Sequence, residues 1–117
     1  MAGVTPKDID VAEVHDCFTI AEIMAYENLG FAKPGEGRDL IRSKETYKEG
    51  SIPVNVDGGL LSKGHPIGAT GGSQIRTIVK QLRGEAGQMQ VKDPAIGLIH
   101  NIGGVGLYGN VTILGRE

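Results

Sequence analysis

The 117-residue sequence has one cysteine, no tryptophan, two phenylalanines and three tyrosines. A single cysteine excludes an intrachain disulfide and favours a reducing environment. No apolar run approaches the roughly 20 residues that span a membrane, and neither end carries a targeting signal, so we expect a cytoplasmic protein without a membrane span. Lys and Arg number 12 against 14 Asp and Glu. Because this balance offers no basic excess to neutralise phosphates, it argues against a nucleic-acid partner.

Glycine, in contrast, is abundant. The sequence has 19 glycines, more than twice the typical usage of roughly 7%. Roughly half of them lie in residues 58–72 and 103–109. Since glycine adopts backbone conformations closed to other residues, we expect the backbone rather than side chains to shape these two segments.

Hydrophobic periodicity predicts the element order β, α, β, α, β, β. The expected strands cover residues 9–14, 52–56, 95–99 and 107–114, and the expected helices cover residues 19–29 and 69–83. Thr19 and Glu22 fit a capping box, while Gly30 and Gly84 fit helix ends. The charged segment 38–49 fits either a short surface helix or an extended excursion.

The short linker 103–106 predicts that the last two strands form an antiparallel hairpin. Together these elements predict one partial α/β layered domain, with a mixed sheet flanked by helices and ending in that hairpin. With about three convincing strands, the sheet should keep exposed edges and an open face.

Four reactive side chains stand at the ends of predicted elements. His15 and Cys17 follow the first strand, His65 precedes a helix, and His100 ends the penultimate strand. Because ligands bind at the carboxyl ends of strands in open α/β sheets, we expect these groups to converge on one edge. Such a cluster suits proton transfer and thiol chemistry.

Each of these residues also has a purely structural interpretation. A single cysteine is often a small core residue, and a histidine beside a turn often serves only as a hydrogen-bonding group. A metal site is not expected, because His-X-Cys is a poor zinc-ligand spacing. The glycine-rich segment also lacks the order of residues that defines a phosphate-binding P-loop.

Three blocks of the sequence resemble those of thiolases. Residues 58–71, GGLLSKGHPIGATG, resemble the thiolase Gly-His-Pro block, and residues 15–18, HDCF, are similar to the form found in sterol-carrier-protein type thiolases. Residues 100–104, HNIGG, fall where most thiolases have Cys-X-Gly. The resemblance extends over roughly residues 8–115. The His loop of ketoacyl synthases is related, but the first two blocks favour thiolase.

The resemblance implies acyl transfer between coenzyme A thioesters, by Claisen condensation or by thiolytic cleavage of a 3-ketoacyl-CoA. It implies that His65 donates to the oxyanion of the thioester enolate and activates the nucleophile. His100 stands where most thiolases have their acid/base cysteine, so the resemblance transfers that role to Cys17. His15 stands where most thiolases have the Asn that holds a water in the oxyanion site.

The remaining site residues also come from the resemblance. The backbone of Ile102 and Gly103 falls where the family places a second oxyanion donor, and Phe18 is expected to line the acyl pocket. The substrates would be acetyl-CoA and other acyl-CoA thioesters, with no resident cofactor and no metal.

The resemblance also indicates what residues 1–117 lack. The acylated nucleophile of thiolases is another cysteine in the N-terminal half, which Cys17 does not match. We therefore expect this chain to be the latter portion of a thiolase C-terminal domain, without the earlier strands and the N-terminal domain. It should need that missing half or a complementary subunit, form a homo-oligomer, and be inactive alone. The alternative is a non-catalytic thiolase-like subunit that binds acyl-CoA or protein partners.

Overall fold

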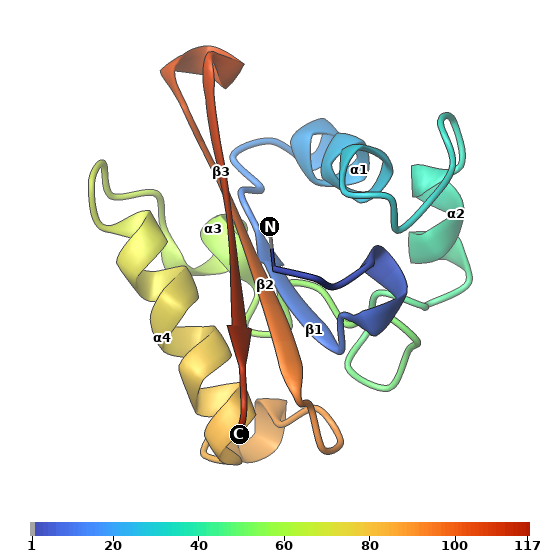
Figure 1. The fold of residues 1–117 in the computed structure, drawn as a ribbon. Coiled ribbons are helices and arrows are strands. Elements are labelled where there is room, and N and C mark those ends of the chain that lie inside the picture. Colours follow the sequence, from blue (N-terminus) through green and yellow to red (C-terminus); the bar gives the residue numbers. More distant parts are fainter. Residues whose placement is uncertain (1) are drawn as a thin grey trace.

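A three-stranded sheet forms the centre of residues 2–117, the part of the chain that the computed structural model describes. The strand order is β1-β2-β3, with β1 parallel to β2 and β2 antiparallel to β3. Helix α4 covers one face of the sheet, while α1 and α2 lie on the other side (Figure 1). The predicted α/β class, the mixed sheet and the C-terminal hairpin are all confirmed.

The elements follow one another in chain order, with short 3₁₀ turns between some of them. They are η1 (Pro6–Asp8), β1 (Val11–Val14), α1 (Thr19–Asn28), α2 (Gly37–Arg42), α3 (Gly59–Lys63), α4 (Thr70–Arg83), η2 (Gly87–Met89), β2 (Ile96–Gly103), η3 (Gly104–Gly106) and β3 (Tyr108–Gly115).

Strand β1 is buried on both faces, and its alternating side chains contribute to two apolar clusters. Val11 packs with Ile78 of α4 and Ile99 of β2. Ala12 and Val14 point to the opposite face, where they join the cluster that contains residues of α1. This two-sided burial explains why three of the four residues of β1 are apolar.

Gly97 allows α4 to approach β2 closely. A Cβ atom on Gly97 would lie 2.4 Å from Cγ2 of Ile78, which is closer than real Cβ contacts. Ile78 is fully buried at this point. The absence of a side chain on β2 therefore makes room for the helix, which in turn sets where the start of α4 lies.

The strand expected over residues 52–56 is wrong in extent. Val54 makes a single parallel bridge to Ala12. Pro53 has no N–H to donate to a ladder, and Asn55 turns to a φ of 49°. The segment therefore touches the edge of β1 without continuing the sheet.

The capping box expected at the start of α1 is also wrong. Phe18 occupies the N-cap position and makes no capping bond through its side chain, so Thr19 lies inside the helix. The Glu22 carboxylate instead accepts hydrogen bonds from Tyr26 Oη at 2.8 Å and Asn55 Nδ2 at 3.2 Å. The predicted helix ends are confirmed, because Gly30 and Gly84 both have positive φ.

Two segments are more helical than their composition indicated. Residues 37–42 form α2, which selects the short surface helix for the first part of segment 38–49. Within the glycine-rich segment, residues 59–63 form the short helix α3 between Gly58 and Gly64, both at positive φ. The glycine-rich segment thus contains a short helix that ends two residues before His65.

The hairpin of β2 and β3 extends beyond the rest of the sheet, with η3 at its tip (Figure 1). Tyr108 and Val111 of β3 are 70% and 54% exposed, and Leu107 beside them is 81% exposed. The exposed surface predicted for the sheet is therefore present at this hairpin, and the structure shows that it is partly apolar.

Candidate active site

Three segments distant in sequence line one cleft of about 900 Å³. They are the residues between β1 and α1, the loop from α3 to α4, and the tip of the β2–β3 hairpin. The sequence-predicted residues along this cleft are His15, Cys17, Phe18, His65, Ile102 and Gly103. Of the four reactive side chains expected to converge at one edge of the sheet, three line this cleft: His15, Cys17 and His65.

His15 and His65 are in direct contact within the cleft. Their ring centroids are 4.8 Å apart, and the rings meet edge to face at 81°. His15 is buried, with 5% of its surface exposed, whereas His65 is exposed. The pair therefore joins a fixed imidazole at the back of the cleft to an accessible one at its mouth.

The pKa of His15 lies below its usual value. Burial is the main cause, and the neighbouring imidazole of His65 adds to the lowering. A hydrogen-bonding interaction with Asn101 and the charge of Asp16 act in the opposite direction. His15 is therefore mainly neutral at neutral pH, so it can present one nitrogen as a donor and the other as an acceptor.

His65 lies just before α4 and is oriented by the first residue of that helix. Thr70 Oγ1 lies 3.5 Å from His65 Nδ1 and donates to the carbonyl oxygen of Pro66 at 3.2 Å. The start of α4 thus holds the turn that carries His65.

Asp16 fixes the segment that carries His15 and Cys17. Its buried carboxylate accepts hydrogen bonds from the backbone N–H groups of Leu60 at 2.7 Å and Leu61 at 3.4 Å. A Cβ atom on Gly59 would lie 2.2 Å from this carboxylate, so glycine is needed for the contact. Asp16 thereby couples His15 and Cys17 to α3 and, through α3, to the turn of His65.

His100 is the one candidate that the structure does not bring to the cleft. It is 9% exposed and lies within β2, paired with Val14 of β1. Burial lowers its pKa, and Nδ1 has no hydrogen-bond partner within the described residues. Because side chains alternate along a strand, His100 lies on the face of Leu98, away from α4.

The same alternation places Asn101 in the cleft, a residue that the sequence analysis missed. Its amide nitrogen would lie 2.8 Å from a Cβ atom on Gly71, at the start of α4. The alternation of side chains along a strand could have predicted this position. If His100 lies on one face of β2, the next residue must lie on the other face.

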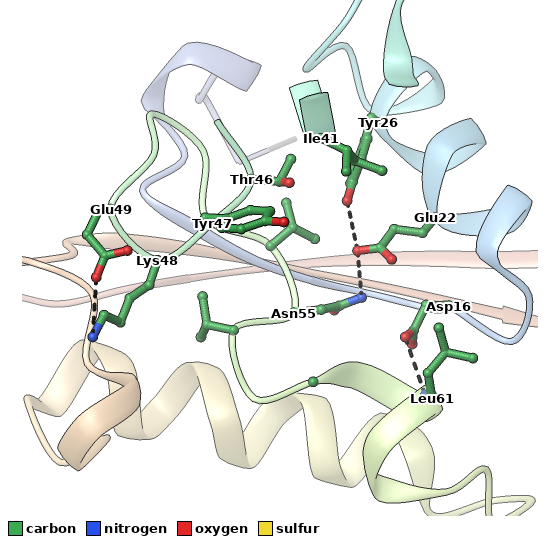
Figure 2. Close-up of a pocket in the computed structure, with 13 residues that line it drawn as sticks. Asp16, Glu22, Tyr26, Ile41, Thr46, Tyr47, Lys48, Glu49, Asn55 and Leu61 are labelled. Atoms are coloured by element: carbon green, nitrogen blue, oxygen red, sulfur yellow. Dashed lines mark hydrogen bonds and ion pairs between the residues drawn. The ribbon is translucent and has the colours of Figure 1, made fainter. Parts of the chain in front are cut away.

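A second cleft, of about 410 Å³, lies between α1, α2 and the segment before α3 (Figure 2). Its central polar groups bond to one another: Glu22 accepts from both Tyr26 and Asn55 (Figure 2). Burial is the main cause that raises the pKa of Glu22. These groups satisfy each other, as buried structural polar groups do.

Two features are absent from residues 2–117, the part of the chain that the structure describes. No helix there combines the length and the apolar character that crossing a membrane requires. Nor do three or more His, Cys, Asp or Glu side chains gather there in an arrangement able to hold a metal ion.

Comparisons with known proteins identify the family of the chain. The family model described as "Thiolase C-terminal domain-like" matches residues 1–116. An acetyl-CoA acetyltransferase of Methanothermobacter thermautotrophicus is 53% identical over 116 residues, covering 99% of this chain and 30% of that protein. Human sterol carrier protein 2 is 47% identical over 102 residues, covering 87% of this chain and 19% of that protein.

A solved structure is also similar. A chain described as "Ltp2-ChsH2(DUF35) aldolase" superposes with a TM-score of 0.87 at 30% identity, covering 98% of this chain and 28% of that chain. The chain thus spans less than a third of the length of each of these proteins. Because the thiolase family model matches residues 1–116 and the relatives are similar over nearly the whole chain, the chain belongs to the thiolase family.

Proposed function

We propose that this chain is the latter portion of a thiolase C-terminal domain and forms one wall of a site for acyl transfer between coenzyme A thioesters. The observation that carries the proposal is the single cleft that joins Cys17, the His15–His65 pair and the backbone of Ile102 and Gly103. The cleft brings a thiol and two imidazoles together beside a mainly apolar wall.

Cys17 is assigned the proton transfer at the carbon next to the thioester carbonyl. Its thiolate takes the α-proton, and the C–H electron pair moves to the carbonyl oxygen to give an enolate. His65, exposed at the cleft mouth, donates a hydrogen bond to that oxygen. Oriented donors of this kind stabilise charge that develops in the transition state.

His15 and the hairpin backbone complete the proposed oxyanion site. A neutral His15 in contact with His65 holds the donor ring or a water in place. The backbone of Ile102 and Gly103 lies along the same cleft and supplies the second donor position. Phe18, 71% exposed at the rim, forms part of the acyl wall.

The nucleophile must come from outside these 117 residues, because Cys17 is the single cysteine and is already assigned. We propose that the missing half of a thiolase, or a complementary subunit, packs on the rim of the cleft. Ile67 and Val105 there are fully exposed, and Leu107 is 81% exposed. Acyl-CoA is the substrate rather than a resident cofactor, the complete protein is a homo-oligomer, and its place is the cytoplasm.

The test is a chimera with the Methanothermobacter relative. Residues 1–116 of this chain replace the matching segment of the acetyl-CoA acetyltransferase, which is 53% identical. We expect the chimera to cleave acetoacetyl-CoA, and His65→Ala to lower kcat by about 10²-fold or more. The isolated chain should show no activity.

Two outcomes would contradict the proposal. Cleavage by the isolated chain, abolished by Cys17→Ala, would show that no further nucleophile is needed. A folded chimera that binds acyl-CoA without turnover would favour the alternative, a non-catalytic thiolase-like subunit. Lys33→Met, a charge removal at an exposed loop residue, is the matched control and should leave turnover unchanged.

A further inference from the structure

Lys63, the last residue of α3, makes two ion pairs that the proposed chemistry does not use. Its ammonium nitrogen lies 3.5 Å from Oε2 of Glu13 on β1 and is in direct contact with the carboxylate of Asp57 before α3. The Lys63 side chain is 29% exposed, whereas those of Glu13 and Asp57 are 1% and 7% exposed. The lysine therefore bridges two buried carboxylates.

Asp57 extends this bridge to two helices. Its carboxylate accepts a hydrogen bond from Thr77 Oγ1 of α4 at 2.6 Å and another from the backbone N–H of Gly59, in α3, at 3.0 Å. These bonds and the Lys63 contact keep the pKa of Asp57 below its usual value despite partial burial. The sheet, α3 and α4 thus meet at one charged cluster.

Glu13 shows how much the cluster depends on the lysine. Burial and the nearby charge of Asp57 raise the pKa of Glu13 to about 8, and Lys63 acts in the opposite direction. Asp16 adds a smaller repulsion. Oε1 of Glu13 has no hydrogen-bond partner within the described residues. Lys63 is therefore the cation between Glu13 and Asp57, and its removal would leave the buried carboxylate of Asp57 without its ion-pair partner.

The cluster is connected to the candidate active site through α3, because Lys63 lies two residues before His65. Helix α3 has only five residues, too few to be stable without external contacts. Asp16 binds its N-terminal end and Lys63 ties down its C-terminal end. Gly64 follows at a φ of 91°, and His65 comes next. The placement of the His65 turn thus depends on what holds Lys63.

We propose that Lys63 is a positioning residue: by bridging Glu13 on β1 and Asp57 before α3, it sets the Gly64–His65 turn against His15. Its importance for turnover rests on the proposed function, but the positioning itself is a property of this chain. A displacement of roughly 1 Å is the scale at which catalytic geometry is lost.

The test measures the contact between the two imidazole rings in the 117-residue chain by NMR. The nuclear Overhauser cross-peak between the His15 and His65 rings, 4.8 Å apart, reports their separation without any turnover. We expect Lys63→Met to weaken it by about twofold or more, the result of a shift of roughly 1 Å. Lys63→Arg keeps a cation and should restore it, and Lys33→Met should leave it unchanged.

Asp57→Asn is the second variant, for the case in which Lys63→Met does not fold. It retains the size of the side chain and an acceptor for Thr77 but removes the charge that faces Lys63. We expect a weaker cross-peak here too. An unchanged cross-peak in a folded Lys63→Met or Asp57→Asn chain would overturn the proposal. A chimera that is inactive although the His15 and His65 rings remain in contact would instead contradict the proposed acyl transfer. It would leave the positioning role of Lys63 intact.

Discussion

The two clefts of this chain differ in how their polar groups are used. In the smaller one, Glu22 is bonded to Tyr26 and Asn55, so the polar groups satisfy each other. In the larger one, Nδ1 of the buried His15 has no hydrogen-bond partner among the described residues. Cys17 and the exposed His65 line the same cleft.

This difference indicates which polar groups stabilise the fold and which can contact a substrate. Groups that bond to one another hold the fold together and have little left for a ligand. In the larger cleft, the exposed His65 and the partly exposed Cys17 are instead open to a substrate. Substitutions in the small cleft should therefore lower the free energy of unfolding, whereas those in the large cleft should spare it.

The largest loss of stability is expected for Asp16→Ala. Asp16 lies beside the small cleft and accepts the N–H groups of Leu60 and Leu61. Hydrogen bonds to charged groups contribute about 1.5–3 kcal/mol, so we expect a loss of that size in urea unfolding. Asp16→Asn, which retains one acceptor oxygen, should lose less. Equal losses for the two variants would show that the carboxylate charge and its second oxygen do not matter.

A smaller loss is expected for Tyr26→Phe. The ring remains buried while the 2.8 Å hydrogen bond to Glu22 disappears. The expected cost is about 1 kcal/mol of unfolding free energy. Because that bond also lowers the pKa of Glu22, the pKa should rise further in the variant, as NMR titration can show. A fully stable variant in which the pKa of Glu22 is unchanged would contradict the structural role of the small cleft.

His15 in the large cleft should affect stability only in acid. Its pKa in the folded chain is below the ordinary value of 6.5, so the folded state binds fewer protons than the unfolded state. The stabilisation is present above pH 6.5 and is lost as the pH falls through that value. The measurement is the urea midpoint at about pH 7.5 and about pH 5.5 for the chain and for His15→Gln. We expect the parent chain to lose more stability between these two pH values than His15→Gln does. Equal losses in the two proteins would contradict a neutral, buried His15.

The smallest effect on stability is expected for Cys17→Ala. The thiol lies at the cleft, partly exposed, and substitutions away from buried or bonded features are usually within about 0.5 kcal/mol. Urea unfolding should therefore not distinguish the variant from the parent chain. A loss as large as that of Asp16→Ala would make Cys17 a structural residue and remove the contrast between the clefts.

Much of the fold was predictable from the sequence because it depends on local patterns. The apolar stripe of α4, the glycines after α1 and α4, and the short hairpin linker are all signals within a few residues. The bridge at Val54 was overestimated as a strand because periodicity does not reveal how Pro53 and Asn55 leave the edge of the sheet.

The site was predictable only in part, for a physical reason. His15 and Cys17 follow β1, and His65 lies in the loop before α4. Their convergence reflects the order of strands and helices, which the sequence pattern predicts. His100 and Asn101 differ by one position on β2, and the register of the strand decides which of them faces the cleft. The Lys63 cluster joins β1 to α3 and α4, and no local pattern encodes contacts of that range.

The central claim is that Cys17, beside His15 and His65, moves the α-proton of an acyl-CoA. The most direct measurement is the exchange of acetyl-CoA methyl protons for deuterium in D₂O, followed by ¹H NMR with the chimera. We predict exchange that Cys17→Ala slows by about 10²-fold or more, while Lys33→Met leaves it unchanged. Exchange at an unchanged rate in a folded Cys17→Ala chimera would contradict the account.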